Sequence, residues 1–371
     1  MNKVTMIGCD LHDVSTVLRV AVGLGEGVRK VFPTSKADEM IAWIKTFSRQ
    51  QGGERIVFAY EASGQGFGLY DDLTEAGIEC YVLAPTHLPH TAHQRKNKDD
   101  DKDALMILEE VRAHVLAGRK LPAVWVPDLA TRDDREAVRL RLQLGEERTR
   151  IKNQIRNLAK RGRLVIPVWF TKSGEWSRRS VQWLQEMAGG GLPPGLRTVL
   201  GTLVNVYEEL CRQMKRLDKA ILELARSDRY AQRFRKLKLM PGVGTLSAMV
   251  FLTEIGDLDR FANRRQLAAY LGLAPAAHGS GNTNDRKGHI TRQGPARVRH
   301  VLCQAAWAAL RCSEWWKDQF NKVKRGSPKR AKVAIVAIMR RLAIAMWHTA
   351  RSPEIDRLIE EWTPQSACLS P

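Results

Sequence analysis

Short apolar runs rich in β-branched residues open the chain and predict a sheet. The predicted strands, separated by helices or by Asp and Gly turns, are residues 3–10, 15–22, 29–34, 55–60 and 79–84. Apolar residues at helical spacing predict helices over residues 37–47, 67–75 and 102–116. The order β-β-β-α-β-α-β-α, beginning with a meander, predicts a mixed sheet with helices on its faces. Pro122 and Pro127 mark its boundary, and we place this α/β domain at residues 1–125.

Helical periodicity dominates the middle of the chain. One long charged helix is predicted over residues 129–161, with only a weak seven-residue seam. After a Gly- and Pro-rich break, a strong apolar heptad seam consists of Leu200, Leu203, Tyr207, Leu210, Met214, Leu217, Ile221 and Leu224. We predict a helical coiled-coil region over residues 126–235. The heptads leave open whether it pairs helices within one chain or joins two chains.

The last third of the chain predicts a second globular region, mainly α-helical, at residues 236–350, followed by a tail at 351–371. Near its start, the turn Met240-Pro241-Gly242-Val243-Gly244 resembles a helix-hairpin-helix turn, in which glycines let backbone N–H groups approach a phosphate. Gly242 and Gly244 are therefore candidate nucleic-acid contacts. A plain tight turn between two helices has the same pattern.

Charge is divided unequally along the chain. The 371 residues include 60 Lys and Arg against 40 Asp and Glu, a net charge of +20. Residues 1–120 hold 15 basic and 17 acidic residues, so the excess lies beyond them. This basic excess favours a polyanionic partner. The six cysteines are scattered without a Cys-x-x-Cys pair, and we expect a protein of the reduced, prokaryotic-type cytoplasm, associated with the nucleoid, without signal peptide or membrane span.

Four carboxylates occupy positions that a single sheet edge can gather. Asp10 ends the first strand and Glu61 the fourth, while Asp100 and Asp103 are one helical turn apart at the start of the closing helix. The ribonuclease H-like fold has this order of elements. Carboxylates that close repel each other unless hard divalent cations neutralise them, which predicts a site for two Mg²⁺ ions. The acids on either side of Asp100 leave a shift by one residue open, and each acid alone is also explained as a helix cap or a solvated residue.

A glycine-rich, basic segment between Gly272 and Gly294 is the second candidate site. Ser280 stands between two glycines, open enough to attack phosphorus, and is the candidate nucleophile, although an ordinary turn serine has the same neighbours. Nearby cations would offset developing negative charge and contact nucleic acid; they are Arg286, Lys287, Arg292, Arg297 and Arg299.

Several motifs taken together give the chain a family resemblance. They are Gly8-Cys9-Asp10-Leu11-His12, Tyr60-Glu61-Ala62-Ser63-Gly64, Lys98-Asp99-Asp100-Asp101-Lys102-Asp103-Ala104, Pro241-Gly242-Val243-Gly244, Gly272-Leu273-Ala274-Pro275, and Ser280-Gly281 followed by Gly288-His289-Ile290-Thr291-Arg292-Gln293-Gly294. With these motifs the chain resembles the insertion-sequence transposases of the DEDD type, whose relatives are recombinases guided by a bridge RNA.

The resemblance implies a RuvC-like first domain, with Asp10, Glu61, Asp100 and Asp103 as the catalytic, magnesium-binding tetrad. It implies that Ser280 is the nucleophile that forms a phosphoserine link with DNA, at a site completed by the tetrad. It also implies donor and target DNA as substrates and a structured noncoding guide RNA as partner. Because recombination at two DNA sites needs more than one active subunit, we expect a dimer or tetramer.

Two other functions are compatible with the same residues. A metal-dependent Holliday-junction resolvase or nuclease would use the same tetrad with water as nucleophile, so Ser280 would be dispensable. A non-catalytic nucleic-acid-binding protein would use the acids only as caps and surface. In that case, replacing Asp10 or Glu61 with alanine would change nothing, and no metal would be required.

Overall fold

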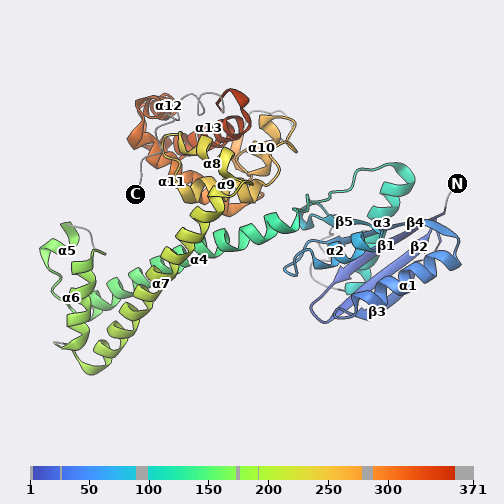
Figure 1. Cartoon of the computed structure of the whole chain (residues 1–371), viewed down its shortest axis with the longest axis horizontal. Helices are drawn as coiled ribbons and strands as arrows, with labels where there is room; N and C mark the ends of the chain where they lie inside the picture. Colours follow the sequence, from blue (N-terminus) through green and yellow to red (C-terminus); the bar gives the residue numbers. More distant parts are fainter. Residues whose placement is uncertain are drawn as a thin grey trace, which may run out of the picture. The chain divides into compact units, whose positions relative to one another are not determined.

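The computed structural model of the chain describes residues 3–25, 27–88, 99–172, 176–190, 192–277 and 287–355. The chain forms two compact units, one up to Pro127 and one from Asp128 onward (Figure 1). The first unit contains a five-stranded sheet, and the second is largely helical. Within the second unit, the limits expected at residues 235 and 350 stay predictions.

The first unit is built on a mixed sheet with the strand order β3-β2-β1-β4-β5. Its strands are β1 (Lys3–Leu11), β2 (Ser15–Val22), β3 (Val28–Pro33), β4 (Gly53–Glu61) and β5 (Glu79–Leu83). Neighbours among the first three strands pair antiparallel, whereas β4 is parallel to β1 and β5 is parallel to β4. The predicted meander and the predicted order of elements are confirmed.

Helices cover both faces of this sheet. Helices α1 (Ala37–Gln50) and α2 (Gly68–Glu75) share one core with strand residues such as Ile7 and Tyr60, and α3 (Asp100–Ala117) shares the other with Met6 and Val57. Because strand side chains alternate between faces, burial on both sides explains why the central strand β1 and the second half of β4 are almost continuously apolar in sequence.

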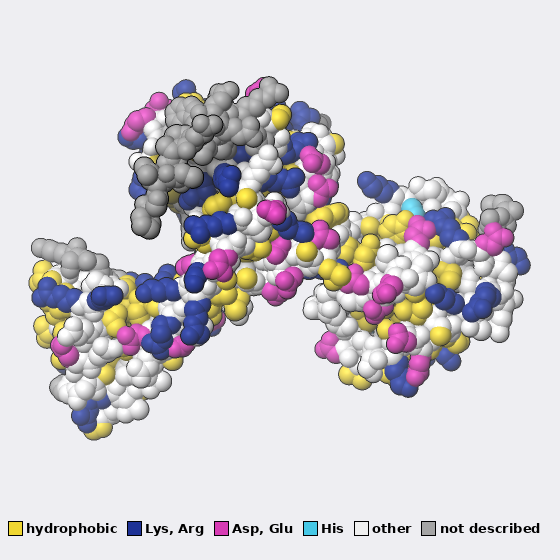
Figure 2. Space-filling view, in the orientation of Figure 1, with side chains coloured by type: hydrophobic (Ala, Val, Ile, Leu, Met, Phe, Trp, Pro, Cys, Tyr) yellow, Lys and Arg dark blue, Asp and Glu magenta, His cyan; other side chains and the backbone are white. Residues whose placement is uncertain are grey.

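The second unit contains ten labelled helices among its described residues and one small β-ribbon (Figure 1). The helices are α4 (Leu129–Arg161), α5 (Val168–Lys172), α6 (Arg178–Gly189), α7 (Pro194–Arg226), α8 (Ala231–Lys238), α9 (Thr245–Ile255), α10 (Arg264–Tyr270), α11 (Ala296–Cys312), α12 (Glu314–Lys324) and α13 (Ala331–Arg351). The apolar spacing had not predicted α5 and α6, which pack aromatic residues against α7. Figure 2 shows Lys and Arg side chains along the α4–α7 pair and on the group of helices α8–α13.

Helices α4 and α7 pack against each other in antiparallel fashion. Leu158, near the end of α4, shares a core with Leu200, near the start of α7, and Arg141 in the first half of α4 pairs with Asp218 in the second half of α7 at 2.7 Å. The apolar face of α7 is therefore covered within the chain, which is the intramolecular alternative. Coiled-coil geometry and a role in joining two chains stay predictions.

The remaining helices surround a single large core. Helix α9 is buried on all sides from Ala248 to Ile255, as expected of a central helix with apolar residues around its whole circumference. The stretch Pro328–Arg351, which includes α13, is long and apolar enough to cross a membrane by length and composition alone, but half of it is buried in this core.

Candidate active site

The end of the parallel pair β1–β4 brings two of the predicted acids to one sheet edge. Cys9 lies opposite Tyr60 in the parallel register, so Asp10 and Glu61 take the next positions on adjacent strands. Because side chains alternate, both acids belong to the face on which Met6 packs with α3. Asp10 is 9% exposed, and Glu61 is half-buried.

Gly8 allows α3 to lie directly against β1, two residues before Asp10. A Cβ atom at Gly8 would lie 2.2 Å from the carbonyl oxygen of Ala104 and 2.2 Å from the amide nitrogen of Leu108. No side chain fits there, and this contact sets the start of α3 beside the end of β1. Sequence reasoning gave Gly8 no role; the available signal was a glycine inside an otherwise apolar strand.

The acids at the start of α3 have different partners. Asp99 is the N-cap, since its carboxylate accepts a hydrogen bond from the Asp101 N–H at 3.2 Å, so the helix begins at Asp100, two residues before the predicted start. Asp101 accepts from Nε of Arg19 at 2.7 Å and lies 3.3 Å from Nε of Arg29. Asp99 and Asp101 thus have structural partners, which favours the register that assigns Asp100 to the site.

The carboxylates of Asp100 and Asp10 both contact the side chain of His12. Nε2 of His12 lies 2.9 Å from Oδ2 of Asp10 and 3.0 Å from Oδ1 of Asp100, and one ligand atom from each of the three residues lies within 4.8 Å of the others. One imidazole nitrogen carries at most one proton, so it cannot donate fully to both carboxylates. His12 follows Asp10 by two residues in the first motif, but sequence reasoning did not assign it to the site.

This group fits a divalent cation. Carboxylate oxygens are ligands for Mg²⁺, Mn²⁺ and Ca²⁺, and a histidine nitrogen also suits transition metals, so the donor set does not by itself select magnesium. Glu61 and Asp103 are not members of the group of three. Asp103 is half-buried on α3, one turn after Asp100, and Glu61 is at the end of β4.

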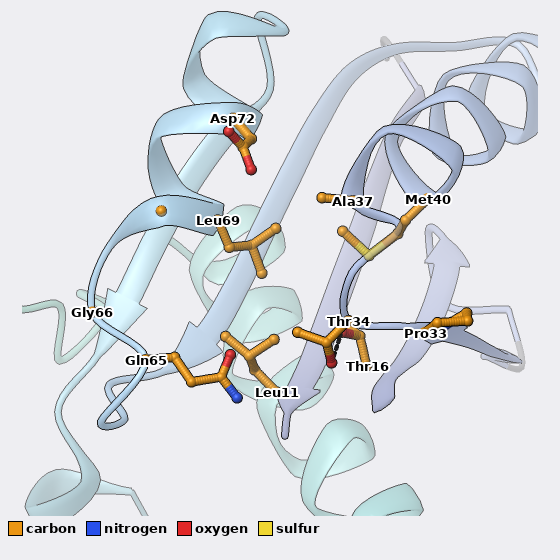
Figure 3. Close-up of a pocket in the computed structure, with 11 residues that line it drawn as sticks. Leu11, Thr16, Pro33, Thr34, Ala37, Met40, Gln65, Gly66, Leu69 and Asp72 are labelled. Carbon is orange, nitrogen blue, oxygen red and sulfur yellow. Dashed lines mark hydrogen bonds between the residues drawn. The ribbon is translucent and has the colours of Figure 1, made fainter. Parts of the chain in front are cut away.

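A separate hollow of about 220 Å³ lies on the other face of the sheet, between α1 and α2 (Figure 3). Its lining includes Leu11, Met40, Leu69 and Asp72, and none of the lining residues is a lysine or arginine. Burial, together with neighbouring acids, raises the pKa of Asp72. A phosphate group would meet no cation here, so we assign the candidate site to the acids on the α3 face.

In the second unit, the serine segment is attached to a two-stranded ribbon. Strand β6 (Pro275–Ala277) pairs antiparallel with β7 (Lys287–Ile290). Ser280 and Arg286, between these strands, lie outside the described residues. Gly294, four residues after β7, has φ of 91°. A Cβ there would lie 1.9 Å from the backbone oxygen of Tyr270, so the chain that leaves the ribbon packs directly against α10. The ribbon was not predicted, because three- and four-residue strands leave almost no periodicity.

The predicted arginines after β7 differ in their surroundings. Arg299 donates to the carbonyl oxygens of Leu271 at 3.1 Å and Gly294 at 3.0 Å, and burial, with repulsion from Arg292, lowers its pKa. Arg299 therefore helps to hold the base of the ribbon. Arg292 and Arg297 are exposed and form no salt bridge with another described residue. They remain available to a phosphate.

In the turn before α9, which resembles a helix-hairpin-helix turn in sequence, both glycines have a structural role. Gly242 has φ of 81°, and a Cβ there would lie 2.4 Å from the amide nitrogen of Ala309 on α11. The N–H of Gly244 donates to Oγ of Ser247 at 2.9 Å. The turn is therefore required for packing, and a phosphate contact at Gly242 or Gly244 stays a prediction.

Comparison with known proteins identifies relatives for both units. Residues 7–162 match a DEDD transposase family of the IS110 type, described as "Transposase", and residues 234–321 match the "Transposase IS116/IS110/IS902 family". A protein of Sinorhizobium fredii named as the transposase y4qE is 30% identical over 323 residues, which cover 80% of this chain and 76% of the relative.

Two relatives are named for individual mobile elements. The "Transposase for insertion sequence element IS1111A" of Coxiella burnetii is 26% identical, covering 68% of this chain and 65% of the relative. The "Transposase for insertion sequence element IS1533" of Leptospira borgpetersenii is 25% identical, covering 83% and 86%. The acids at the sheet edge, the two family matches and the length of the shared sequence agree. The chain belongs to the IS110 family of DEDD transposases, DNA-binding enzymes for which the family implies a divalent metal ion.

Proposed function

We propose that this transposase works through a RuvC-like, ribonuclease H-like first domain whose catalytic acids are Asp10, Glu61, Asp100 and Asp103. The observation that carries the proposal is the meeting of Asp10 and Asp100 with His12, which brings residues from β1 and α3 to one sheet edge. The strand order β3-β2-β1-β4-β5 also supports it, because the middle strand β1 is the one that ends at the acids.

The proposed cofactor is a pair of Mg²⁺ ions held at this edge. When bound, divalent cations act as Lewis acids at a phosphodiester and neutralise charge on its oxygens. Asp10 and Asp100 would provide ligands directly, with Glu61 and Asp103 completing the set. His12 would orient the two aspartates through the contacts it already makes.

The proposed nucleophile is Ser280. Its hydroxyl oxygen would attack a DNA phosphodiester to form a phosphoserine bond while one strand end leaves, and the strand ends would then be exchanged. Arg292 and Arg297, which are exposed, would offset charge at the phosphate together with Arg286 and Lys287.

We further propose that a structured noncoding RNA guides the enzyme to donor and target DNA. The support is the excess of basic residues beyond residue 120, which suits long phosphate backbones whatever their base sequence. The enzyme would act as a dimer or tetramer in the nucleoid of a prokaryotic-type cytoplasm, with the α4–α7 pair contributing to assembly.

The test is a recombination assay in cells that contain the DNA flanking the element, with covalent protein–DNA adducts trapped by denaturation. Wild type is compared with Ser280→Ala, Glu61→Ala and, as a matched serine control on the surface, Ser35→Ala. We expect recombination to be lost in the first two variants, the adduct to be absent in Ser280→Ala, and the control to match wild type. Cleavage by Ser280→Ala that is still lost in Glu61→Ala would instead identify a metal-dependent nuclease.

A further inference from the structure

A basic and aromatic hollow of about 880 Å³ is lined by α10, α12 and α13, and α13 packs against both of the other helices (Figure 1). Four arginines line it, Arg264 and Arg265 from α10 and Arg340 and Arg341 from α13, together with Trp315 from the start of α12. The volume is in the range of pockets that bury a small ligand. The hollow belongs neither to the acidic group nor to the ribbon that carries the serine segment.

Among the described residues, none neutralises the positive charge of this hollow. No lining residue is acidic, and none of the four arginines forms a salt bridge within the described part of the chain. Arg341 donates instead to the neutral amide oxygen of Gln319 at 2.7 Å. Glu314 begins the neighbouring helix, but it pairs with Lys317 at 3.2 Å. Four guanidinium groups that have no acidic partner among the described residues favour an anionic ligand.

Trp315 provides a second and different signal. Its side chain is 59% exposed, whereas the adjacent Trp316 is only 6% exposed and packs into the core. The two rings meet edge to face, with centroids 4.7 Å apart and planes at 82°, so the exposed ring packs on the buried one. An exposed indole beside arginines without an acidic partner among the described residues is the combination on which bases stack in proteins that bind single strands.

We propose that this hollow binds an unpaired nucleotide of a single-stranded nucleic acid. Trp315 stacks on the base, and the four arginines contact the phosphates on either side of it. A base inside a duplex has no free face for Trp315, so the site distinguishes single strands from double strands. The inference goes beyond the proposed tetrad and serine chemistry, because it concerns strand binding at other residues.

The surroundings allow a strand to continue past the hollow. A second hollow, of about 560 Å³, shares His348 with the first and is lined by Arg233. The same second hollow also contains Arg351, which is paired with Asp259 at 2.6 Å. Arg233 therefore offers the next phosphate contact along the surface, while Arg351 is already engaged.

The test measures binding of the full chain to fluorescent oligonucleotides by anisotropy, with a chelator present so that no strand is cut. The probes are a short single-stranded DNA, the RNA of the same sequence, and the blunt DNA duplex. We expect Trp315→Ala to weaken single-strand binding about 10-fold, the effect of losing one stacked base, and to leave duplex binding within about 2-fold. Trp315→Phe should restore most of the binding, because it keeps an aromatic ring.

The arginines are tested by salt dependence. Arg340→Gln combined with Arg341→Gln should reduce the slope of log K against log salt by about 1.4 for single strands, or about 0.7 for each lost phosphate contact. The matched control, Lys329→Gln with Lys332→Gln, removes the same charge from exposed residues that do not line the hollow, and should change single-strand and duplex binding by the same small factor.

The two single-stranded probes identify the source of the nucleotide. Tighter binding of RNA would assign the site to the guide RNA, and tighter binding of DNA would assign it to an opened DNA strand. Equal losses on single strands and duplex in Trp315→Ala, or no loss on either, would overturn the proposal. Neither result depends on Ser280 or on metal, so the failure of this inference is distinguishable from the failure of the proposed mechanism.

Discussion

In the first unit, Asp10 and Asp100 share one imidazole, whereas in the second unit the buried Glu254 is held by a guanidinium group. Both carboxylate oxygens of Glu254 accept from Arg139, at 2.7 and 3.0 Å. Arg135 lies beside this pair and donates to the backbone oxygen of Glu254 at 2.9 Å. An acid with a fork of guanidinium donors is satisfied by the fold. Two acids that share one imidazole nitrogen compete for its single proton, and such a pair is suited to binding a cation.

The largest expected effect separates functional from structural acids on a single helix. Asp100→Asn should lower metal-dependent DNA cleavage by more than the roughly 10–100-fold typical of losing a partner that only orients a metal ligand. The matched change Asp101→Asn should lower stability by about 1 kcal/mol through the loss of its arginine pairs, with cleavage by the folded protein retained. Cleavage assays and urea unfolding of both variants measure this. If Asp101→Asn lowered cleavage more than Asp100→Asn, the proposed tetrad would contain Asp101 in place of Asp100.

Gly8→Ala tests whether close packing of α3 on β1 builds the site. The new Cβ would meet backbone atoms at 2.2 Å, which no rotamer change can relieve, so we expect a loss of about 3 kcal/mol in the free energy of unfolding. Cleavage should fall as well, because α3 carries Asp100. Urea unfolding followed by circular dichroism measures the first effect. Gly64→Ala, at an exposed glycine with open space around it, is the control and should be nearly neutral.

Glu254→Gln tests the contrasting acid of the second unit. Because Glu254 is 6% exposed and Arg139 is 34% exposed, we expect a loss of about 2 kcal/mol, below the 3–5 kcal/mol of a fully buried broken pair. Asp218→Asn removes the partner of Arg141 at a half-exposed carboxylate and should cost less than about 1 kcal/mol. Urea unfolding of the two variants measures both losses of stability. Equal losses would contradict the assignment of Glu254 as a core acid.

The smallest expected effect is on the pH dependence of stability. Partial burial acts to raise the pKa of Asp128, the N-cap of α4, but hydrogen bonds from the Thr131 N–H and from Arg229 outweigh it and hold the pKa below its usual value. A lowered folded pKa means that the carboxylate stabilises the protein above its usual pKa and stops doing so as the pH falls through the folded value.

The variant that tests this is Asp128→Asn, which keeps a capping side chain but removes the charge. Wild type should be more stable than the variant by about 0.5 kcal/mol near neutral pH, and the difference should disappear as the pH falls below about 4. Urea unfolding at several pH values measures it. A difference that does not change with pH would show that the charge of Asp128 contributes nothing.

Much of the first unit follows from its sequence because its strands are apolar runs rich in β-branched residues, separated by helices or by Asp and Gly turns. The bounds of all five strands, including the three of the meander, were predicted within a few residues. The start of α3 was predicted two residues late, because a run of aspartates carries no apolar periodicity and the cap at Asp99 is visible only as a hydrogen bond. Helix α5 was missed because it is short, and α6 because it contributes mainly Trp183 and Leu184 to a core made with other helices, which leaves little apolar periodicity of its own.

The residues of the candidate site were likewise predicted only in part. The acids of the proposed tetrad became candidates because each occupies the end of a predicted strand or the start of a predicted helix, and the structure brings Asp10 and Asp100 together at His12. His12 and Gly8 were not assigned, because neither has a local signature: the role of His12 depends on the position of Asp100, and that of Gly8 on the backbone of Ala104. Both contacts join segments that are far apart in the chain.

The sequence by itself determined the uneven division of charge and the family, and it predicted the strands of the first unit, the long helices and the acids at element ends. The predicted elements and their acids depend on residues a few positions apart, within the reach of one strand or one helical turn. Only the tertiary structure decided which acids of the run at residues 99–103 are taken by Arg19, Arg29 or the helix cap, and which one meets His12. The reason is that partner choice depends on which backbones pack together, and Gly8 controls that approach without leaving any periodic trace in the sequence.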